Sequence, residues 1–324
     1  MFRKRNAHDE GSEYHRGESR QIQAMSIFMK PDTRVLVQGI TGREGRRSTR
    51  EMLDYGTIIS CGVTPGKKGI TIEGVTVFDS VREALEFDEE INTSVLYVPP
   101  LMVLDAAMEA MDAGIRLIII VTENVPIMDA AKLLEQGQRY GAKIIGPSSV
   151  GVISPGVGKL GSIGGSEPER VYSKGPVGVI SKSGGMCAET ASLLTAAGLG
   201  QSTVVGIGGD VIIGTTFVDV MELFQEDDNT EVVVLFGEVG GAYEEIAAEM
   251  IQKKRFTKPV IAFISGKFAE SISEGLALGH AGAVVEEGFG TAEEKVEALR
   301  QAGAIVAEYH HYIPELVKQA RRSL

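Results

Sequence analysis

The chain has 324 residues, which corresponds to about two domains of ~100–200 residues each and excludes a single small module. Its net charge of −12 leaves no basic field for nucleic-acid phosphates, and no apolar run approaches the ~18 residues of a membrane span, so we expect neither a nucleic acid nor a membrane as partner. The two cysteines, Cys61 and Cys187, stand far apart in the sequence, which suggests neither a disulfide framework nor a cysteine-based zinc site and fits a reducing compartment.

The N-terminal segment has the composition of a disordered tail. Residues 1–24 carry charges of both signs and almost no aliphatic side chains, so they cannot bury enough surface to fold. This stretch lacks the apolar region of a signal peptide, and its acidic residues argue against a transit peptide. We therefore expect a disordered tail over residues 1–28 and a cytoplasmic protein.

From residue 33 onward, short apolar runs rich in β-forming residues alternate with longer helical patterns. This alternation is typical of a parallel sheet covered by helices on both faces, so the sequence predicts an α/β fold. The expected strands form two series, Arg34–Gln38, Ile58–Val63, Ser94–Val98, Leu117–Val121 and Lys143–Ile145 in the first and Val177–Ile180, Thr203–Val205, Val232–Phe236, Val260–Ile264 and Ala304–Val306 in the second. Two series predict two sheets, one in a domain over residues 29–158 and one in a domain over residues 159–324.

The loop after the first expected strand has the pattern of an anion site. Gly39–Gly45 reads GITGREG and opens a helix, so backbone N–H groups and the helix dipole can cradle a phosphate there. A site for NAD would place a carboxylate about 20 residues further on, whereas the second strand runs into Thr64–Lys68, which reads TPGKK. Cations at this point suit a nucleotide with an additional phosphate, so NADP and coenzyme A both fit. The alternative is a surface turn with two solvated lysines.

One histidine stands out by its position. Of the five, two lie in the expected tail and two adjoin each other near the C-terminus, which leaves His280 within the sequence GHAGA. Small neighbours let a phosphoryl group or another backbone approach the imidazole closely, and histidine is a competent nucleophile. The alternative is a structural histidine that is held by hydrogen bonds.

Two further motifs could serve a reactive histidine. Ser181–Met186 reads SKSGGM and precedes the expected helix Cys187–Ala197, so its N–H groups form a second anion cradle. Glu238, between glycines after a strand, could hold one ring nitrogen of a histidine and fix its tautomer, although alone it could equally be a charge at a helix start. Because ligands bind at the carboxyl ends of strands in open α/β sheets, these motifs predict one ligand site in each domain.

Together these motifs resemble the α subunit of succinyl-CoA synthetase and the corresponding part of ATP-citrate lyase. The resemblance extends from about Pro31 to Lys318 and is carried by QGITG (Gln38–Gly42), YGT (Tyr55–Thr57), GVTPGKKG (Gly62–Gly69), YVPP (Tyr97–Pro100), VTE (Val121–Glu123), SKSGGM (Ser181–Met186), GIGGD (Gly206–Asp210), GEVGG (Gly237–Gly241), TKPV (Thr257–Val260) and GHAGA (Gly279–Ala283). It implies a Rossmann-like CoA-binding domain followed by a flavodoxin-like, doubly wound ligase domain.

The resemblance also implies residue roles, in which His280 would be phosphorylated and Glu238 would orient it. The residues expected to contact coenzyme A are Thr41, Gly42, Arg43, Glu44, Lys67, Val121, Thr122 and Glu123, and those expected at the phosphate or the acid are Ser148, Ser149, Ser183, Gly184, Gly185, Ala188 and Gly282. In the implied reaction, ATP or GTP phosphorylates the histidine, a carboxylic acid takes the phosphoryl group to form an acyl phosphate, and the CoA thiol attacks that acyl phosphate.

A partner subunit is part of the same implication. The family pairs its α subunit with an ATP-grasp β subunit, in an αβ or α2β2 assembly. The sequence has no P-loop and no evident cluster of metal ligands, so we expect no metal site in this chain and place the nucleotide and Mg²⁺ on the partner.

Some positions depart from the succinate enzymes. Gly146–Gly151 reads GPSSVG where those enzymes read GPNCPG, and Ala188 stands where they place a substrate-contacting tyrosine. Both changes are more similar to ATP-citrate lyase, and the hydroxyls of Ser148 and Ser149 could bind a third carboxylate and a hydroxyl. We therefore expect citrate as the acid, with succinate or malate as alternatives. Outside this class, the alternatives are an NADP-dependent oxidoreductase and a non-catalytic CoA-binding regulator.

Overall fold

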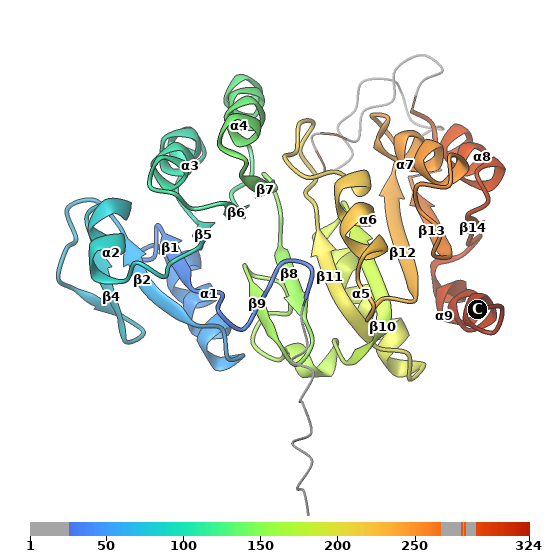
Figure 1. Ribbon diagram of the computed structural model, residues 1–324, viewed down its shortest axis with the longest axis horizontal. Helices are drawn as coiled ribbons and strands as arrows, with labels where there is room; N and C mark the ends of the chain where they lie inside the picture. Colours follow the sequence, from blue (N-terminus) through green and yellow to red (C-terminus); the bar gives the residue numbers. More distant parts are fainter. Residues whose placement is uncertain (1–25, 267–279, 281, 283–289) are drawn as a thin grey trace, which may run out of the picture.

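The computed structural model describes residues 26–266, 280, 282 and 290–324. Over these residues the chain forms two lobes, each built on a seven-stranded sheet, with the first lobe at the left of Figure 1 and the second at the right. No helix in this part of the chain is long and apolar enough to cross a membrane.

The first sheet has the strand order of a dinucleotide-binding fold. Its order is β3-β4-β2-β1-β5-β6-β7, and all neighbours pair in parallel except β3 and β4. Without the short β3, the parallel strands follow the Rossmann order 3-2-1-4-5-6. The elements are β1 (Val35–Gln38), α1 (Arg43–Asp54), β2 (Ile59–Val63), β3 (Thr71–Ile72), β4 (Val75–Phe78), α2 (Val81–Phe87), β5 (Thr93–Leu96), a 3-10 turn (Pro100–Met102), α3 (Val103–Asp112), β6 (Leu117–Ile120), α4 (Ile127–Tyr140) and β7 (Lys143–Ile145).

The second sheet has the flavodoxin order. It reads β14-β13-β12-β10-β11-β8-β9, so its five parallel strands, β10 to β14, follow the order 2-1-3-4-5. The elements are β8 (Gly151–Ser154), β9 (Gly158–Leu160), a 3-10 turn (Pro168–Arg170), β10 (Lys174–Ser181), α5 (Gly184–Ala196), β11 (Gln201–Gly206), α6 (Phe217–Gln225), β12 (Val232–Glu238), α7 (Tyr243–Gln252), β13 (Val260–Ser265), α8 (Ala292–Gln301), β14 (Ile305–Val306), a 3-10 turn (His310–Tyr312) and α9 (Ile313–Arg321). The expected two-domain α/β fold is confirmed.

Strand β12 shows why this sheet is covered on both faces. All seven of its residues are buried, and successive side chains point to opposite faces. Val232 and Val234 pack in the core under α5 and α9, whereas Val233 and Leu235 pack in the core under α6, α7 and α8. A continuous apolar run of this kind fits only a strand with helices on either side.

Two antiparallel hairpins are not predicted by the sequence. β3 and β4 are short, and β8 and β9 lie in the stretch rich in Gly, Pro and Ser that resembles a linker. β8 pairs with β11, with Ile153 opposite Val204, so the chain enters the second sheet at Gly151. The expected boundary at residue 158 therefore falls inside this hairpin, and the division between the sheets lies between β7 and β8.

The β8–β9 hairpin lies at the junction of the two lobes and joins them (Figure 1). The Thr57 hydroxyl of the first lobe donates to the Lys159 carbonyl at 2.7 Å and accepts from the Lys159 N–H at 3.1 Å. The Lys159 ammonium is fully buried, 3.6 Å from Glu51 Oε2 in α1, and donates to the Gly165 carbonyl at 2.6 Å. These contacts set the orientation of α1 relative to the second sheet.

The core includes a residue within the expected tail. Residues 1–25 lie outside the described residues, but Phe28 and Met29 are only 8% and 2% exposed and belong to the core. Ser26 accepts a hydrogen bond of 2.5 Å from the Ser154 hydroxyl. The expected tail over residues 1–28 is thus too long at its C-terminal end, because two apolar side chains at its border find a place in the core.

Candidate active site

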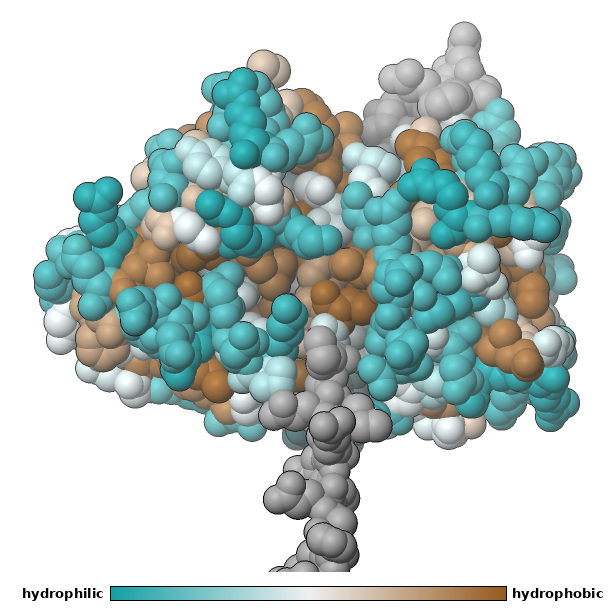
Figure 2. Space-filling model, in the orientation of Figure 1, coloured by the Kyte–Doolittle hydropathy of each residue, from teal (hydrophilic) through white to brown (hydrophobic). Residues whose placement is uncertain are grey.

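A cavity of about 900 Å³ opens where the strand order of the first sheet reverses, between β1 and β5. It is lined by Gln38, Gly39, Thr41, Gly42, Glu44, Val63, Thr64, Pro65, Tyr97, Val98, Pro99, Met102, Asp105, Ala106, Glu109, Val121, Thr122, Glu123 and Ser162. The walls are mostly apolar, and Figure 2 shows hydrophobic side chains gathered below α3 on this lobe. Its size and lining fit a large organic ligand with a few polar groups.

Two glycines let helix α1 begin at the rim of this cavity. Gly39 has φ +79°, and a Cβ there would lie 2.9 Å from the Tyr97 carbonyl group. A Cβ on Gly45 would lie 2.4 Å from the Gly39 carbonyl oxygen, so only glycine allows this first turn to pack on the strand end. Gly42 is the N-cap of α1, which leaves the first N–H groups of that helix free for an anion.

Six of the residues expected to contact coenzyme A line this cavity: Thr41, Gly42, Glu44, Val121, Thr122 and Glu123. The other two do not. The Arg43 side chain is 93% exposed, and Lys67 is an exposed residue in the loop after β2 whose N–H donates to Asp79 Oδ1. The sequence reasoning did not assign the wall that the loop after β5 and helix α3 form, because an apolar lining residue in a helix, such as Ala106, has no motif that separates it from core.

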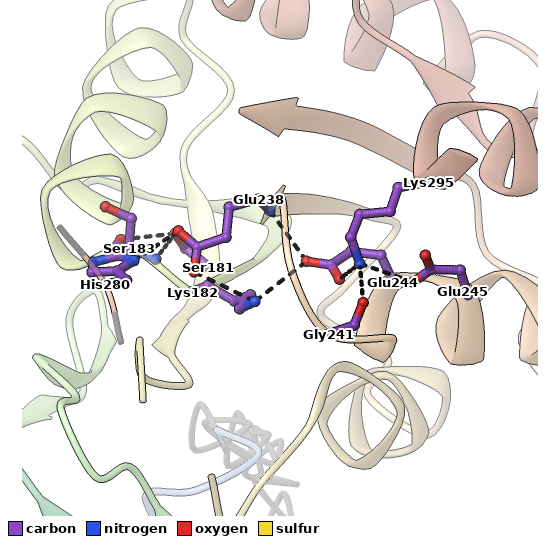
Figure 3. Close-up of polar contacts among 9 residues, drawn as sticks. All are labelled: Ser181, Lys182, Ser183, Glu238, Gly241, Glu244, Glu245, His280 and Lys295. Atoms are coloured by element: carbon purple, nitrogen blue, oxygen red, sulfur yellow. Dashed lines mark hydrogen bonds and ion pairs between the residues drawn. The ribbon is translucent and has the colours of Figure 1, made fainter. Parts of the chain in front are cut away.

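The second site lies at the carboxyl ends of β10 and β12, which is the point of strand-order reversal in the second sheet. Glu238 is the last residue of β12, and its Oε2 lies 2.7 Å from Nδ1 of His280 (Figure 3). The Glu238 side chain is 11% exposed and that of His280 is 29% exposed. Glu238, which the sequence analysis named as a possible partner of a histidine ring nitrogen, is therefore the direct partner of His280.

Lys182 is a third member of this site, and the sequence reasoning did not single it out. It follows β10 directly, its side chain is 2% exposed, and its Nζ lies 3.4 Å from Glu238 Oε1. The buried ammonium is thus a counter-charge to the buried carboxylate. The SKSGGM motif indicates a phosphate cradle, but nothing in the sequence shows that its lysine turns inward.

The charges around His280 shift its titration and that of its partner. The hydrogen bond to Glu238 raises the pKa of His280 above its ordinary value of 6.5, against the opposing effect of burial. Burial alone would raise the pKa of Glu238, but the His280 hydrogen bond and the Lys182 ammonium together hold that pKa below 4.5. Glu238 is thus an ionised acceptor, and the histidine Nδ1 carries the donated proton.

The loop after β11 supports the imidazole from the side. A Cβ on Gly209 would lie 2.8 Å from Cγ and Cδ2 of His280, so the backbone of Gly209 is packed against the ring. The N–H of Gly282 donates to the Gly209 carbonyl at 3.1 Å, which fastens the histidine loop to the same segment. Next to it, burial and then the Glu123 carboxylate raise the pKa of Asp210, and Asp210 Oδ2 is buried without a hydrogen-bond partner among the described residues.

Glu123 and Ser148 connect the two sites. Glu123 lines the first cavity, and its charge also raises the pKa of both Asp210 and His280. The Ser148 N–H donates to the Thr122 carbonyl at 2.9 Å, and the Ser148 carbonyl accepts from the Gly209 N–H at 3.4 Å. The loop that carries Glu123 at the first cavity is therefore joined through Ser148 to the loop that packs against the histidine.

Comparisons with known proteins agree with this arrangement. Residues 30–124 match the family model of the CoA binding domain, and residues 180–305 match the family model of CoA-ligase. The chain is 47% identical over 295 residues to the succinate–CoA ligase [ADP-forming] subunit alpha 2 of Archaeoglobus fulgidus, which covers 91% of this chain and 99% of that protein. The chain belongs to the succinate–CoA ligase α-subunit family. The expected class of CoA ligase is confirmed.

The names of other relatives give different acids as their substrates. The chain is 47% identical over 285 residues to the succinate–CoA ligase [ADP-forming] subunit alpha of Methanothermobacter thermautotrophicus (88% of this chain, 94% of that one). It is 41% identical over 298 residues to an ADP-forming sulfoacetate-CoA ligase subunit of an Acholeplasma species (91% and 98%). The ATP citrate lyase of Methanosaeta concilii, solved in complex with (3S)-citryl-CoA, has a TM-score of 0.85 and 25% identity, covering 92% of this chain and 51% of that chain. The chain thus spans about half the length of that lyase.

In this member of the succinate–CoA ligase family, three of the residues expected at the phosphate or the acid, Ser183, Gly184 and Gly185, form the start of α5. Ser183 is the N-cap and accepts from the Met186 N–H at 3.5 Å, so Gly184 and Gly185 lie in the first turn, where N–H groups have no intrahelical partner. A Cβ on Gly184 would lie 2.2 Å from Val150 Cγ1, which explains that glycine by packing. Ala188 lies one turn further along α5 and is half-buried.

Ser149 does not have the free hydroxyl that the citrate expectation assigned to it. Its side chain is 2% exposed, its hydroxyl donates to the Gly206 carbonyl at 2.5 Å, and its oxygen accepts from the Gly151 N–H at 2.8 Å. The residue ties the loop after β7 to the end of β11. The expectation that both serines bind the acid is therefore wrong for the Ser149 donor, because the backbone already uses it.

Proposed function

We propose that this chain is the catalytic α-type subunit of an ADP- or GDP-forming acid–CoA ligase in which His280 carries a phosphoryl group. The observation that carries this proposal is the 2.7 Å hydrogen bond between His280 Nδ1 and Glu238 Oε2. It stands at the carboxyl edge of the second sheet, and Glu123 joins that edge to the cavity of the CoA-binding domain.

Glu238 selects the nucleophilic atom. With the proton on Nδ1 held by the carboxylate, the lone pair at Nε2 is free to attack phosphorus. The Nε2–P bond forms as the bond from phosphorus to the nucleoside diphosphate oxygen breaks, and the ring becomes positively charged. The Glu238 carboxylate stabilises that charge in the same way that an aspartate stabilises the imidazolium of a serine hydrolase.

The second half of the reaction returns the ring to its starting state. A carboxylate oxygen of the acid attacks phosphorus, the N–P bond breaks, and its electron pair goes back to Nε2. The resulting acyl phosphate is then opened by the CoA thiolate, and inorganic phosphate leaves. The free N–H groups at the start of α5 are suited to hold the phosphoryl oxygens, since a helix N-terminus favours anions.

For the acid we propose a small dicarboxylate, succinate, ahead of the tricarboxylate citrate. The relatives at 44–47% identity are named succinate–CoA ligases. The small side chain of Ala188 and the likeness to ATP citrate lyase still support citrate. The Ser149 hydroxyl no longer supports it, because that hydroxyl donates to the Gly206 carbonyl.

We propose that the nucleotide and Mg²⁺ come from an ATP-grasp β subunit. The succinate–CoA ligase relatives are named α subunits, and this sequence has no P-loop. Assembly as αβ or α2β2 is compatible with this role.

The test is thioester formation by the reconstituted complex. The initial rate is measured with ATP or GTP, CoA and each of succinate, malate and citrate, and kcat/KM is compared among the acids. His280→Asn should abolish the activity, whereas His310→Asn, a matched change at a half-buried histidine bonded to Thr190, should retain it. A tenfold advantage for citrate would overturn the assignment of succinate, and activity in His280→Asn would overturn the mechanism.

A further inference from the structure

A row of buried charges continues from the Glu238–His280 pair into the second lobe (Figure 3). Lys182 Nζ lies 3.4 Å from Glu238 Oε1 and 3.9 Å from Glu244 Oε1. On the far side, Glu244 Oε2 accepts a hydrogen bond of 2.6 Å from Lys295 Nζ. The side chains of Glu244 and Lys295 have no exposed surface, so the row lies inside the domain.

The charges of this row alternate in sign. Lys182 stands between Glu238 and Glu244, and Lys295 stands between Glu244 and Glu245, whose Oε2 is 2.9 Å from the ammonium. Each ammonium is therefore shared by two carboxylates. Adding or removing one charge changes how strongly its neighbour binds to the next group in the row.

Local backbone features hold Glu244 in place. Its Oε1 accepts a hydrogen bond of 3.2 Å from the Glu238 N–H, so one side chain touches both the backbone and the counter-ion of Glu238. A Cβ on Gly237 would lie 2.7 Å from Glu244 Cγ, so the glycine of the GEVGG motif leaves the space in which this side chain lies. Lys295 also donates to the Gly241 carbonyl at 2.9 Å, which ties α8 to the same motif.

Stability alone does not explain such a row. Buried ion pairs often contribute little or even cost stability relative to well-packed apolar side chains, because both charges must leave water. The row ends at the one histidine whose ring nitrogens must be in a defined protonation state for phosphoryl transfer. A role in setting that state accounts for its position.

We propose that Lys182 is a positioning residue whose ammonium sets the charge balance of the Glu238–His280 pair. Glu244, which Lys295 holds in place, competes with Glu238 for this ammonium and so determines how strongly Lys182 acts on the pair. The inference deepens the proposed function and rests on His280 as the phosphoryl acceptor. The Lys182 ammonium holds Glu238 ionised, and Glu244, which accepts from the Glu238 N–H, holds that residue in place, so that the proton stays on Nδ1 and Nε2 stays free.

The signs follow from the charged groups that face the histidine. These groups are Glu238 from β12, Lys182 after β10, Glu123 after β6 and Asp210 after β11, with Glu244 and Glu245 of α7 and Lys295 of α8 behind them. The Lys182 ammonium lowers the pKa of His280. Loss of that ammonium should therefore raise the pKa, whereas loss of the Glu244 charge should commit Lys182 to Glu238, weaken the hold of Glu238 on the ring and lower the pKa.

The test is an NMR titration of the full chain alone, with ¹⁵N-labelled histidine and with His280→Asn to assign the signal. It requires no partner, nucleotide or acid, so it succeeds or fails independently of the proposed function. The variants are Lys182→Met, Glu244→Gln and the double variant, which restores the charge balance. Lys159→Met is the matched control, because it removes a similarly buried ammonium whose partners, Glu51 and the Gly165 carbonyl, are not members of the row.

We expect Lys182→Met to raise the pKa of His280, Glu244→Gln to lower it, and the double variant to return it toward the wild-type value, with no change in Lys159→Met. In the complex, Lys182→Met should slow phosphorylation at neutral pH by at least about tenfold, and Lys182→Arg should restore most of the rate. If Lys182→Met does not fold, the Glu244→Gln variant tests the proposal by itself, since an unchanged or raised pKa of His280 in that variant overturns the proposal. Shifts of the same sign in both single variants, or an equal shift in Lys159→Met, also overturn it.

Discussion

The backbone of Gly209 packs against the imidazole of His280, and a Cβ at that position would lie 2.8 Å from two of the ring carbons. Gly209→Ala should therefore push the ring away from Glu238 and lower the rate of His280 phosphorylation at least about tenfold, because near-attack geometry is sensitive to shifts of about 1 Å. The measurement is the initial rate in the reconstituted complex.

The matched control is Gly158→Ala. A Cβ at Gly158 would meet Met29 Sδ at 3.4 Å and Thr57 Oγ1 at 3.5 Å, which is ordinary contact. This variant should keep the wild-type rate. A Gly209→Ala enzyme as fast as Gly158→Ala would show that the ring is not confined by this contact.

Glu238→Gln should reduce phosphorylation by about 10²- to 10⁴-fold. The amide has nearly the same shape, but it can donate to Nδ1 and so favour the tautomer with the proton on Nε2, which blocks attack. CoA binding, measured by calorimetry, should be unchanged because Glu238 does not line the first cavity. A rate within threefold of wild type would contradict the role assigned to this carboxylate.

The Glu238–His280 pair predicts a pH dependence of stability. The raised pKa of His280 stabilises the fold below pH 6.5, and this contribution is lost as pH rises through the pKa of the folded state. The lowered pKa of Glu238 stabilises the fold above pH 4.5 and is lost as pH falls through its folded value. The difference in melting temperature between wild type and His280→Asn should therefore be largest between pH 4.5 and 6.5. A difference that grows above pH 8 would contradict this sign.

Two truncations locate the true start of the fold. Removing residues 1–25 should leave the melting temperature nearly unchanged, because we expect no core contribution from the charged tail. Removing residues 1–29 deletes the buried Phe28 and Met29 and should cost on the order of 2–5 kcal/mol. Equal melting temperatures for the two truncations would show that these side chains contribute nothing.

Much of the architecture could be predicted because strand and helix patterns alternate clearly. Buried parallel strands such as β12 contain a continuous apolar run, here Val232–Phe236, and the motifs that follow them share one sheet edge. This placement puts Glu238 at the sheet edge, but its pairing with His280 was expected from the combination of motifs and from the family resemblance, because GHAGA does not follow an expected strand. The β8–β9 hairpin could not be predicted, since its glycines and serines resemble a linker until they pair with β11.

The burial of the charged residues behind the site could not be predicted from the sequence, and the reason is physical. Charged residues on helices normally face water, so Glu244 and Lys295 are expected at the surface. Their burial depends on each other and on the space beside Gly237, which are tertiary relationships. Ser149 shows the converse, because a polar residue that suggested a substrate donor is bonded to the backbone.

The most direct test of the account is phosphorylation of this chain by γ-labelled nucleotide in the presence of its partner subunit. The account predicts a label on this chain that is stable in base and labile in acid, which is the behaviour of a phosphoramidate on imidazole. The label should be absent from His280→Asn, retained in His310→Asn, and discharged from wild type by adding the acid with CoA. A label that persists in His280→Asn would contradict the central claim.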